Sequence, residues 1–241
     1  MPPTLKQMFP DQQPKVIFLD AMGTLFDLKS SVGEIYQRYA LKYGVEVAAP
    51  AIEAAFITSF KSAPPLAFSG TELAAIKQQE FSWWKHVVAA TFTELEVQEK
   101  FTDFDSFFSE IYFYFGTKEP WYLFPDTVDS LKLWRDRGIT LGVISNFDSR
   151  LLEVLNQLDL EQFFTSITIS STAGFAKPEA NIFQIALDKH QARSSEALHI
   201  GDNPIEDYEG AQQAGLGALW LNRHARSLNI ENQLPNLCSL G

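Results

Sequence analysis

The sequence predicts an α/β fold: a doubly wound parallel sheet whose chain is interrupted by an inserted helical domain. After Pro125, short apolar runs alternate with segments of helical periodicity, which is typical of parallel β-α-β units. The first apolar run, at 16–19, is separated from the others by a long segment in which only helical periodicity is clear. We therefore expect an α/β core of residues 1–28 and 121–241. Residues 29–120 would form a helical domain over the carboxyl ends of the strands.

The elements are justified in order along the chain. Four consecutive apolar residues predict a buried strand at Val16–Leu19. In the inserted domain, apolar side chains recur at helical spacing in four stretches: Val32, Ile35, Tyr36 and Tyr39; Ile52, Ala55, Phe56 and Phe60; Trp83, Trp84, Val87 and Val88; and the aromatic-rich segment 101–115. The later core elements are predicted strands at 139–145, 166–170, 197–200 and 218–221, and predicted helices at 127–137, 149–158, 180–190 and 206–214. Gly138 and Gly215 are suited to end two of these helices.

Composition and charge exclude several classes of function. The 241 residues include 30 Asp and Glu against 19 Lys and Arg, which gives a formal charge of −11. Such a chain has no general affinity for nucleic acid or for anionic membranes, and no apolar segment is long enough to span a bilayer. Any phosphate site must therefore be built locally, from a metal ion, a lysine and backbone N–H groups.

The cysteine content and the N-terminal segment predict a cytoplasmic location. Cys238 is the single cysteine, so no disulfide can form within the chain, as is usual in a reducing compartment. The first 15 residues are polar and rich in proline, and they lack the apolar segment of a secretory signal. We therefore expect a cytoplasmic protein without a membrane partner.

Asp20 is the first candidate catalytic residue. It follows the first predicted strand directly, and a Gly23-Thr24 turn comes soon after it. In an open α/β sheet, the carboxyl ends of the strands form the ligand crevice. A carboxylate placed there by a buried strand is held rigidly, as a nucleophile or a metal ligand must be. The alternative is an Asp that only stabilises the turn after a strand.

Two further segments place polar groups at strand–helix junctions. Ser145 and the N–H of Asn146 follow a predicted strand, where they can donate to an anion with help from the next helix dipole. Asp148 is expected to cap that helix. Lys177 stands before a proline suited to a helix start, where the dipole disfavours a cation. We therefore expect Lys177 to share an anion with Asp20, although an exposed, solvated lysine is the alternative.

Two more acids follow the strand predicted at 197–200. Asp202 comes directly after Gly201, and Asp207 stands five residues further on, at the start of the next predicted helix. Three carboxylates at one sheet edge repel one another, whereas with Mg²⁺ they form a hard, oxygen-ligated site. Asp207 alone could be an acid at a helix N-terminus. A buried strand end is, however, an expensive place for an unpaired carboxylate such as Asp202.

Four motifs together resemble those of the haloacid dehalogenase superfamily. They are, in order, Asp20-x-x-Gly23-Thr24, Ser145, Lys177-Pro178 and Gly201-Asp202-x-x-x-x-Asp207. Each motif is weak alone, but four in order at predicted strand ends or strand–helix junctions are specific. The helical insert is similar to the cap domain that this family places on its Rossmann-like core.

The resemblance implies a role for each matching residue. Asp20 would attack phosphorus and become an aspartyl phosphate, a form of covalent catalysis. Ser145 and Lys177 would bind the phosphoryl oxygens, and Thr24 would support the nucleophile loop. Asp20, the backbone carbonyl of Met22 and Asp202 would hold Mg²⁺, with Asp207 beside or behind the metal. A small phosphorylated metabolite would be the substrate.

One position departs from the pattern of the family. Typical phosphatases of the family carry Asp, as general acid and base, two residues after the nucleophile, where this chain has Met22. A thioether cannot donate a proton or activate water, and such help is typically worth about 10²–10⁴-fold in rate. The 2-haloacid dehalogenases also lack that Asp and need no metal. Their Ser-Ser-Asn pattern at the fourth motif, however, differs from Gly201-Asp202.

We therefore predict a Mg²⁺-dependent phosphohydrolase that acts best on substrates with good leaving groups, such as acyl or aryl phosphates. Met22 keeps two alternatives open: a metal-independent 2-haloacid dehalogenase, and a catalytically weakened protein that retains the phosphate site. The aromatic side chains of the insert are more typical of a packed core than of a substrate pocket.

Overall fold

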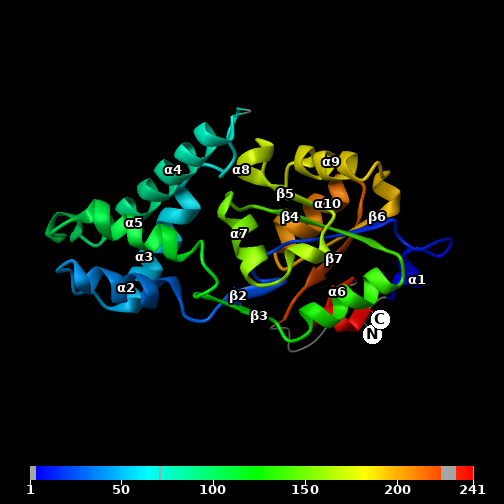
Figure 1. Ribbon diagram of the computed structural model, residues 1–241, viewed down its shortest axis with the longest axis horizontal. Coiled ribbons are helices and arrows are strands. Elements are labelled where there is room, and N and C mark those ends of the chain that lie inside the picture. The colour runs from blue at the N-terminus through cyan, green and yellow to red at the C-terminus, as the bar shows by residue number, and fades with distance from the viewer. Residues whose placement is uncertain (1–3, 71, 224–231, 241) are drawn as a thin grey trace.

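The computed structural model describes residues 4–70, 72–223 and 232–240 (Figure 1). Its strands are β1 (Val16–Leu19), β2 (Phe26–Leu28), β3 (Trp121–Leu123), β4 (Thr140–Ser145), β5 (Ser166–Ile169), β6 (Ala197–Gly201), β7 (Gly217–Leu221) and β8 (Gln233–Leu234). Its α-helices are α1 (Leu5–Met8), α2 (Val32–Lys42), α3 (Ala49–Ser62), α4 (Leu73–Glu94), α5 (Phe104–Tyr114), α6 (Thr127–Asp136), α7 (Arg150–Gln157), α8 (Ser170–Ala173), α9 (Ala180–Lys189) and α10 (Gly210–Gln213). Shorter helical turns are η1 (Gln98–Lys100), η2 (Glu161–Phe163), η3 (Ser194–Glu196), η4 (Pro204–Glu209) and η5 (Leu237–Leu240). Residues 1–3, 71, 224–231 and 241, which the predicted domain ranges include, lie outside the described residues.

Six strands form the main sheet, in the order β5-β4-β1-β6-β7-β8, and every neighbouring pair is parallel. β1 lies at the centre, where Val16 pairs with Thr140 of β4 on one side and with Ala197 of β6 on the other. The strand order reverses at β1, so the carboxyl ends of β1, β4 and β6 meet at one crevice. The predicted doubly wound parallel sheet is confirmed.

β1 separates two apolar layers because its side chains alternate between the faces of the sheet. Ile17 and Leu19 pack into the apolar cluster that includes residues of α6 and α7. Val16 and Phe18 pack into the cluster that includes residues of α9 and α10. All four side chains are fully buried, which is why this strand is a continuous apolar run rather than an alternating one.

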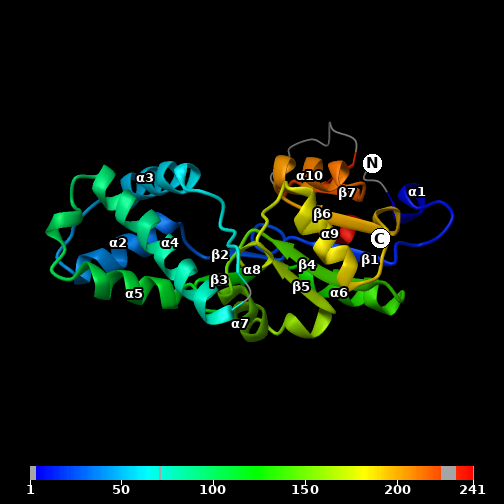
Figure 2. The ribbon, with the colours of Figure 1, turned by 90° about the horizontal axis from the view of Figure 1, so that it is seen from above.

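A helical lobe, defined here as α2 to α5, lies beside the sheet (Figure 2). Its core is aromatic: the ring of Phe107 lies 5.3 Å from that of Phe92 and 4.5 Å from that of Phe101. The lobe elements span residues 32–114, and the domain boundaries 29–120 stay a prediction. In the described part of the chain, no helix has the length and apolar character that crossing a bilayer demands.

A short antiparallel ribbon of β2 and β3 joins the lobe to the core. Phe26 pairs with Leu123, and Leu28 pairs with Trp121. The rings of Phe26 and Trp121 meet edge to face at 5.2 Å. The sequence analysis missed this ribbon because three-residue strands have too few positions to show a period, and their pairing joins distant segments.

Several local expectations are wrong. The helix predicted at 206–214 is a wide π-helical turn, η4, followed by the short α10, because the N–H groups of Asp207 and Tyr208 both point at the carbonyl of Asn203. Pro178 does not start a helix: it follows a cis peptide bond and precedes Glu179, which flanks α9. The aromatic helix predicted from residue 101 begins at Phe104 instead.

Glu80 of α4 connects the helical lobe to the core. Its side chain is fully buried, and its carboxylate accepts three hydrogen bonds, from Ser149 N (2.9 Å), Ser149 Oγ (2.6 Å) and Ser171 Oγ (2.6 Å). One turn further along α4, Trp84 Nε1 donates to Asp148 Oδ2 at 2.6 Å. Asp148 also accepts from Arg150 N, the first N–H of α7, at 3.0 Å, but the N-cap residue is Ser149 rather than the expected Asp148. The lobe is thus attached to the core by buried polar contacts.

We expect Glu80→Ala to lower the free energy of unfolding by about 2–4 kcal/mol. The substitution leaves three buried donors without an acceptor, and each unsatisfied group costs about 1–3 kcal/mol before relaxation. Urea denaturation measures the effect. Gln79→Ala, at an exposed position of the same helix, is the matched control and should change stability by less than about 0.5 kcal/mol. Equal midpoints for the two variants would contradict the assignment.

Candidate active site

Asp20 lies at the carboxyl end of β1, and polar groups from two other loops converge on it. Its Oδ1 accepts a hydrogen bond from Ser145 Oγ at 2.9 Å and another from Lys177 Nζ at 2.7 Å. Asp20 itself is only 7% exposed. Burial raises the pKa of Asp20, while the charge of Lys177 and the two hydrogen bonds oppose that shift. The structure thus brings three of the predicted site residues together.

Lys177 is buried between two carboxylates, so the interpretation of an exposed lysine is wrong. It is 4% exposed, and its Nζ donates to Asp20 Oδ1 and also to Asp207 Oδ1. Burial by itself lowers the pKa of Lys177, but the charges of Asp20 and Asp207 more than compensate and raise it above its usual value. Lys177 therefore stays protonated inside the protein.

Asn146 holds the Lys177 segment in place. Its Oδ1 accepts from Lys177 N at 2.7 Å, and its Nδ2 donates to the carbonyl of Lys177 at 2.9 Å. Nδ2 also donates to Glu206 Oε2 at 3.0 Å. The side chain of Asn146 therefore links the loops after β4 and β6. These contacts all involve the side chain of Asn146. They do not involve its backbone N–H, which is the group predicted to bind an anion.

Asp207 anchors the base of the site from the turn η4. Besides Lys177, it contacts His199 Nε2 through Oδ1 at 2.9 Å and accepts from Asn203 N through Oδ2 at 3.0 Å. Although burial raises the pKa of Asp207, Lys177 and His199 hold it well below its usual value. Burial lowers the pKa of His199, whereas its contact with the Asp207 carboxylate opposes that shift.

Two side chains in this network were not identified from the sequence. His199 lies in the middle of the buried strand β6. A single histidine in an apolar strand forms no motif of spaced residues, so the sequence did not identify it. Glu206 reaches the network only because the wide turn η4 directs it toward Asn146. Burial raises the pKa of Glu206, with Asp207 and Asp20 adding repulsion and Lys177 opposing it. Only the fold brings these groups to the site.

Asp202 is exposed, in contrast to the expectation of a buried strand end. Its carboxyl group nevertheless lies against the nucleophile loop: a Cβ at Gly23, which has a φ of +83°, would be 2.5 Å from Asp202 Cγ. Glycine is therefore required there for two reasons. Thr24 Oγ1 makes a long 3.4 Å contact with Asp202 Oδ1. Partial desolvation, with repulsion from Asp20 and Asp207, raises the pKa of Asp202 to about 7.

The three carboxylates fit a divalent cation. One oxygen each of Asp20, Asp202 and Asp207 lies within 4.8 Å of the others. Lys177 is the one protonated side chain that contacts this group among the described residues, so the acids outnumber the positive charge. Desolvation is the largest cause of the raised pKa of Asp202, and repulsion from Asp20 and Asp207 adds to it. Hard carboxylate oxygens are the ligands that Mg²⁺ prefers.

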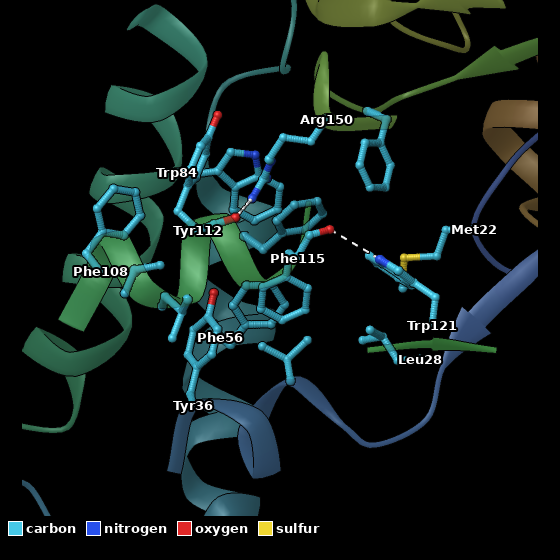
Figure 3. A pocket seen from close by; sticks show the side chains of 15 residues that line it. Met22, Leu28, Tyr36, Phe56, Trp84, Phe108, Tyr112, Phe115, Trp121 and Arg150 are labelled. Carbon is cyan, nitrogen blue, oxygen red and sulfur yellow. Dashed lines mark hydrogen bonds between the residues drawn. The ribbon is translucent and has the colours of Figure 1, made fainter. Parts of the chain in front are cut away.

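Met22 lies where the site meets an apolar cavity beneath the helical lobe (Figure 3). The cavity has a volume of about 220 Å³, and Met22 is 39% exposed. Much of the remaining wall is aromatic, with rings from the lobe and from β3 that include Tyr36, Phe56, Trp84, Phe108, Phe115 and Trp121. Part of the aromatic set expected to be plain core therefore lines a cavity.

Fold and site together describe an α/β enzyme built around a strand-end carboxylate. A model of the haloacid dehalogenase-like hydrolase family matches residues 14–215. Haloacid dehalogenase-like hydrolase domain-containing protein 3 of Xenopus laevis is 32% identical over 202 residues, which cover 84% of this chain and 82% of that protein. The chain therefore belongs to the haloacid dehalogenase-like hydrolase family, as the four motifs predicted.

Solved structures with this fold include phosphatases and dehalogenases. The haloacid dehalogenase-type phosphatase of Thermococcus onnurineus has a TM-score of 0.63 at 19% identity, over 94% of this chain and 95% of that one. The magnesium-bound hydrolase YfnB of Bacillus subtilis has a TM-score of 0.65 at 18% identity, over 95% and 97%. The L-2-haloacid dehalogenase of Xanthobacter autotrophicus has a TM-score of 0.65 at 14% identity, over 89% and 80%. These similarities show the fold.

Lys177→Met should lower the free energy of unfolding by about 3–5 kcal/mol in buffer that contains EDTA. Removing one partner of a buried ion pair leaves uncompensated charge on Asp20 and Asp207. Chemical denaturation measures the loss. The double variant Lys177→Met/Asp207→Asn should recover part of it, because one of the two charges is then gone.

Lys61→Met, at an exposed position of α3, is the control for losing a lysine. Its effect should stay below about 0.5 kcal/mol. If Lys177→Met is no less stable than Lys61→Met, Lys177 does not neutralise the buried carboxylates.

Proposed function

We propose that this protein is a Mg²⁺-dependent phosphohydrolase in which Asp20 is the nucleophile. The observation that supports this most is the placement of Ser145 and Lys177 on the Asp20 carboxylate, with Asp202 alongside. Two donors that already converge on one carboxylate oxygen are suited to bind the oxygens of a phosphoryl group delivered to that carboxylate. The acid cluster would hold the ion.

The reaction proceeds in two displacements. An Asp20 oxygen attacks phosphorus, the bond from phosphorus to the leaving oxygen breaks, and the leaving group departs with the bonding electron pair. Water then attacks phosphorus, which releases inorganic phosphate and restores the Asp20 carboxylate. Ser145 and Lys177 stabilise the phosphoryl oxygens in both steps. The N–H of Asn146 is a third donor at this position.

Mg²⁺ would be held by Asp20, the carbonyl of Met22 and Asp202. When bound, it supplies positive charge that offsets repulsion between the carboxylates and the phosphoryl oxygens. Asp207 has both oxygens engaged by Lys177, His199 and Asn203. We therefore give Asp207 the role of holding Lys177 beside the metal, and Thr24 that of supporting the nucleophile loop.

Met22 determines which phosphate compounds are suitable substrates. Because a thioether has no proton to give, the leaving group must depart unassisted or take its proton from water. Small acyl and aryl phosphates meet this requirement better than alkyl phosphates do. The helical lobe would act as the cap that selects among small phosphorylated metabolites. The cytoplasmic location stays a prediction from the sequence.

Met22 also supports a second candidate function, 2-haloacid dehalogenation. Displacing halide from carbon needs no general acid, and the apolar cavity beside Met22 could hold a carbon chain. The acid cluster favours the phosphohydrolase, because a dehalogenase has no use for three neighbouring carboxylates. Release of halide from 2-chloropropionate in EDTA, in the absence of any hydrolysis of acetyl phosphate with Mg²⁺, would favour the dehalogenase instead.

Asp202→Asn should weaken Mg²⁺ binding until calorimetric titration detects no heat of binding. The substitution removes one charged ligand while keeping the size of the side chain. Asp129→Asn, an equal change of charge at an exposed position of α6, should bind Mg²⁺ like the wild type. Similar titrations for wild type and Asp202→Asn would show that the metal assignment is wrong.

Asp20→Asn should reduce hydrolysis of acetyl phosphate to the background rate, because an amide is a poor nucleophile toward phosphorus. Trapping with beryllofluoride and Mg²⁺, followed by ¹⁹F NMR, should give a bound signal in the wild type and none in the variant. Asp129→Asn again serves as the control. Unchanged turnover in Asp20→Asn would mean that another group, or water directly, attacks phosphorus.

Met22→Asp should raise the turnover of alkyl phosphates by up to about 10²-fold, at the low end of what acid–base catalysis supplies. The gain should be smaller for aryl phosphates, whose leaving groups need little protonation. The measurement is kcat/KM for ethyl phosphate and phenyl phosphate at saturating Mg²⁺.

Met22→Leu is the matched control for this substitution, since it changes the side chain without adding an acid, and it should give no gain. Equal changes for both esters in a folded, Mg²⁺-binding Met22→Asp variant would count against the missing-acid explanation.

A further inference from the structure

The apolar cavity shares its border with the two loops that carry the catalytic groups. Met22 comes two residues after Asp20, and Phe147 comes two residues after Ser145, and both line the cavity. Figure 3 shows Met22 and Trp121 at one side of the cavity, with the lobe residues opposite. The atoms that follow the phosphoryl group of a bound substrate would therefore extend past these side chains into the cavity.

The cavity offers a bound group no free charge. Arg150 is the one charged residue of its wall. Its Nε and Nη2 donate to Asp148 at 2.8 and 2.6 Å, and its Nη1 donates to the carbonyl of Tyr112 at 2.6 Å. Its guanidinium also stacks on the Tyr112 ring, 3.9 Å from the centroid. A ligand carboxylate would have to displace these partners, so the cavity disfavours an anion.

The size of the cavity suits about one aromatic ring. An apolar cavity of about 150 Å³ is enough to bind benzene, and this one has about 220 Å³. Rings in its wall, such as Phe56, Trp84 and Trp121, can meet a ligand ring edge to face. Tyr36 of α2 and Tyr112 of α5 are buried side chains of the wall that carry a hydroxyl group.

We propose that this cavity is the leaving-group subsite, and that it takes an uncharged, apolar group of about one aromatic ring. The assignment rests on the proposed phosphohydrolase function, and it names the substrate class: aryl phosphates rather than sugar, nucleotide or carboxylate-bearing phosphates. It also gives Met22 a second task as a specificity-determining residue. An acid at position 22 would face the apolar wall, whereas a thioether continues it.

The first test measures occupancy of the cavity without any chemistry. Toluene, which carries no phosphate, is titrated into the protein while tryptophan fluorescence is recorded, since Trp84 and Trp121 line the cavity. We expect a saturable change in the wild type. Val88→Phe, which places a ring in the cavity, should lose it. His86→Phe, at an exposed position of the same helix, should keep it. No saturable change in the wild type would overturn the proposal.

The second test compares two esters that differ in one charge. We expect kcat/KM for phenyl phosphate to exceed that for 4-carboxyphenyl phosphate by at least about 10-fold, and Val88→Phe to reduce the difference. Toluene should inhibit hydrolysis of phenyl phosphate competitively. Equal kcat/KM values for the two esters would overturn the leaving-group assignment even if toluene binds.

Acetyl phosphate separates failure of the subsite from failure of the proposed function, because it has no ring. Hydrolysis of acetyl phosphate without toluene binding would overturn the subsite alone. Toluene binding without Asp20-dependent hydrolysis of any of the three phosphates would overturn the phosphohydrolase function and the leaving-group assignment with it.

Discussion

The ammonium group of Lys177, enclosed between the carboxylates of Asp20 and Asp207, is the interaction on which the site depends. Three acids gathered at one sheet edge would otherwise repel one another and favour protonation. Lys177 favours the charged form of Asp207, and Asp207 in turn contacts the ring of His199. Because the lysine is buried, its charge acts in a medium that screens it poorly. The rest of the local structure, from the Asn146 contacts to the turn η4, serves to hold that lysine in position.

The loop from Asp20 to Met22 and the loop from Ser145 to Phe147 each face two different environments. On the side of the sheet they carry charged and hydrogen-bonding groups, and on the side of the helical lobe they present Met22 and Phe147 to an apolar cavity. In the proposed phosphohydrolase, Met22 at the position of the usual acid would have two coupled effects. Proton donation to the leaving oxygen would be lost, and apolar contact beside that oxygen would be gained. A substrate with an apolar aryl leaving group would benefit from the second effect and be little harmed by the first.

The cavity depends on how the lobe is attached, because its wall is formed by residues of both the lobe and the core. Glu80 and Trp84 of α4 hold the lobe against Ser149, Ser171 and Asp148. Asp148 also neutralises Arg150, the one charged residue of the cavity wall. A contact that attaches the lobe thus helps to keep the cavity uncharged. Phosphatases and dehalogenases share this fold, so the choice between them depends on such side chains rather than on the architecture.

The sequence by itself determined the family, the parallel sheet and the positions of Asp20, Ser145, Lys177, Asp202 and Asp207, because apolar runs mark buried strands and parallel strands bring their carboxyl ends to one edge. Tertiary structure alone decided the rest. His199 and Glu206 joined the network through contacts between distant segments, and Asp202 proved exposed although its strand is buried. The β2–β3 ribbon and the cavity were equally invisible in the sequence. The physical reason is that periodicity reports which face of an element is buried, but not which distant side chain, or which empty volume, that face meets.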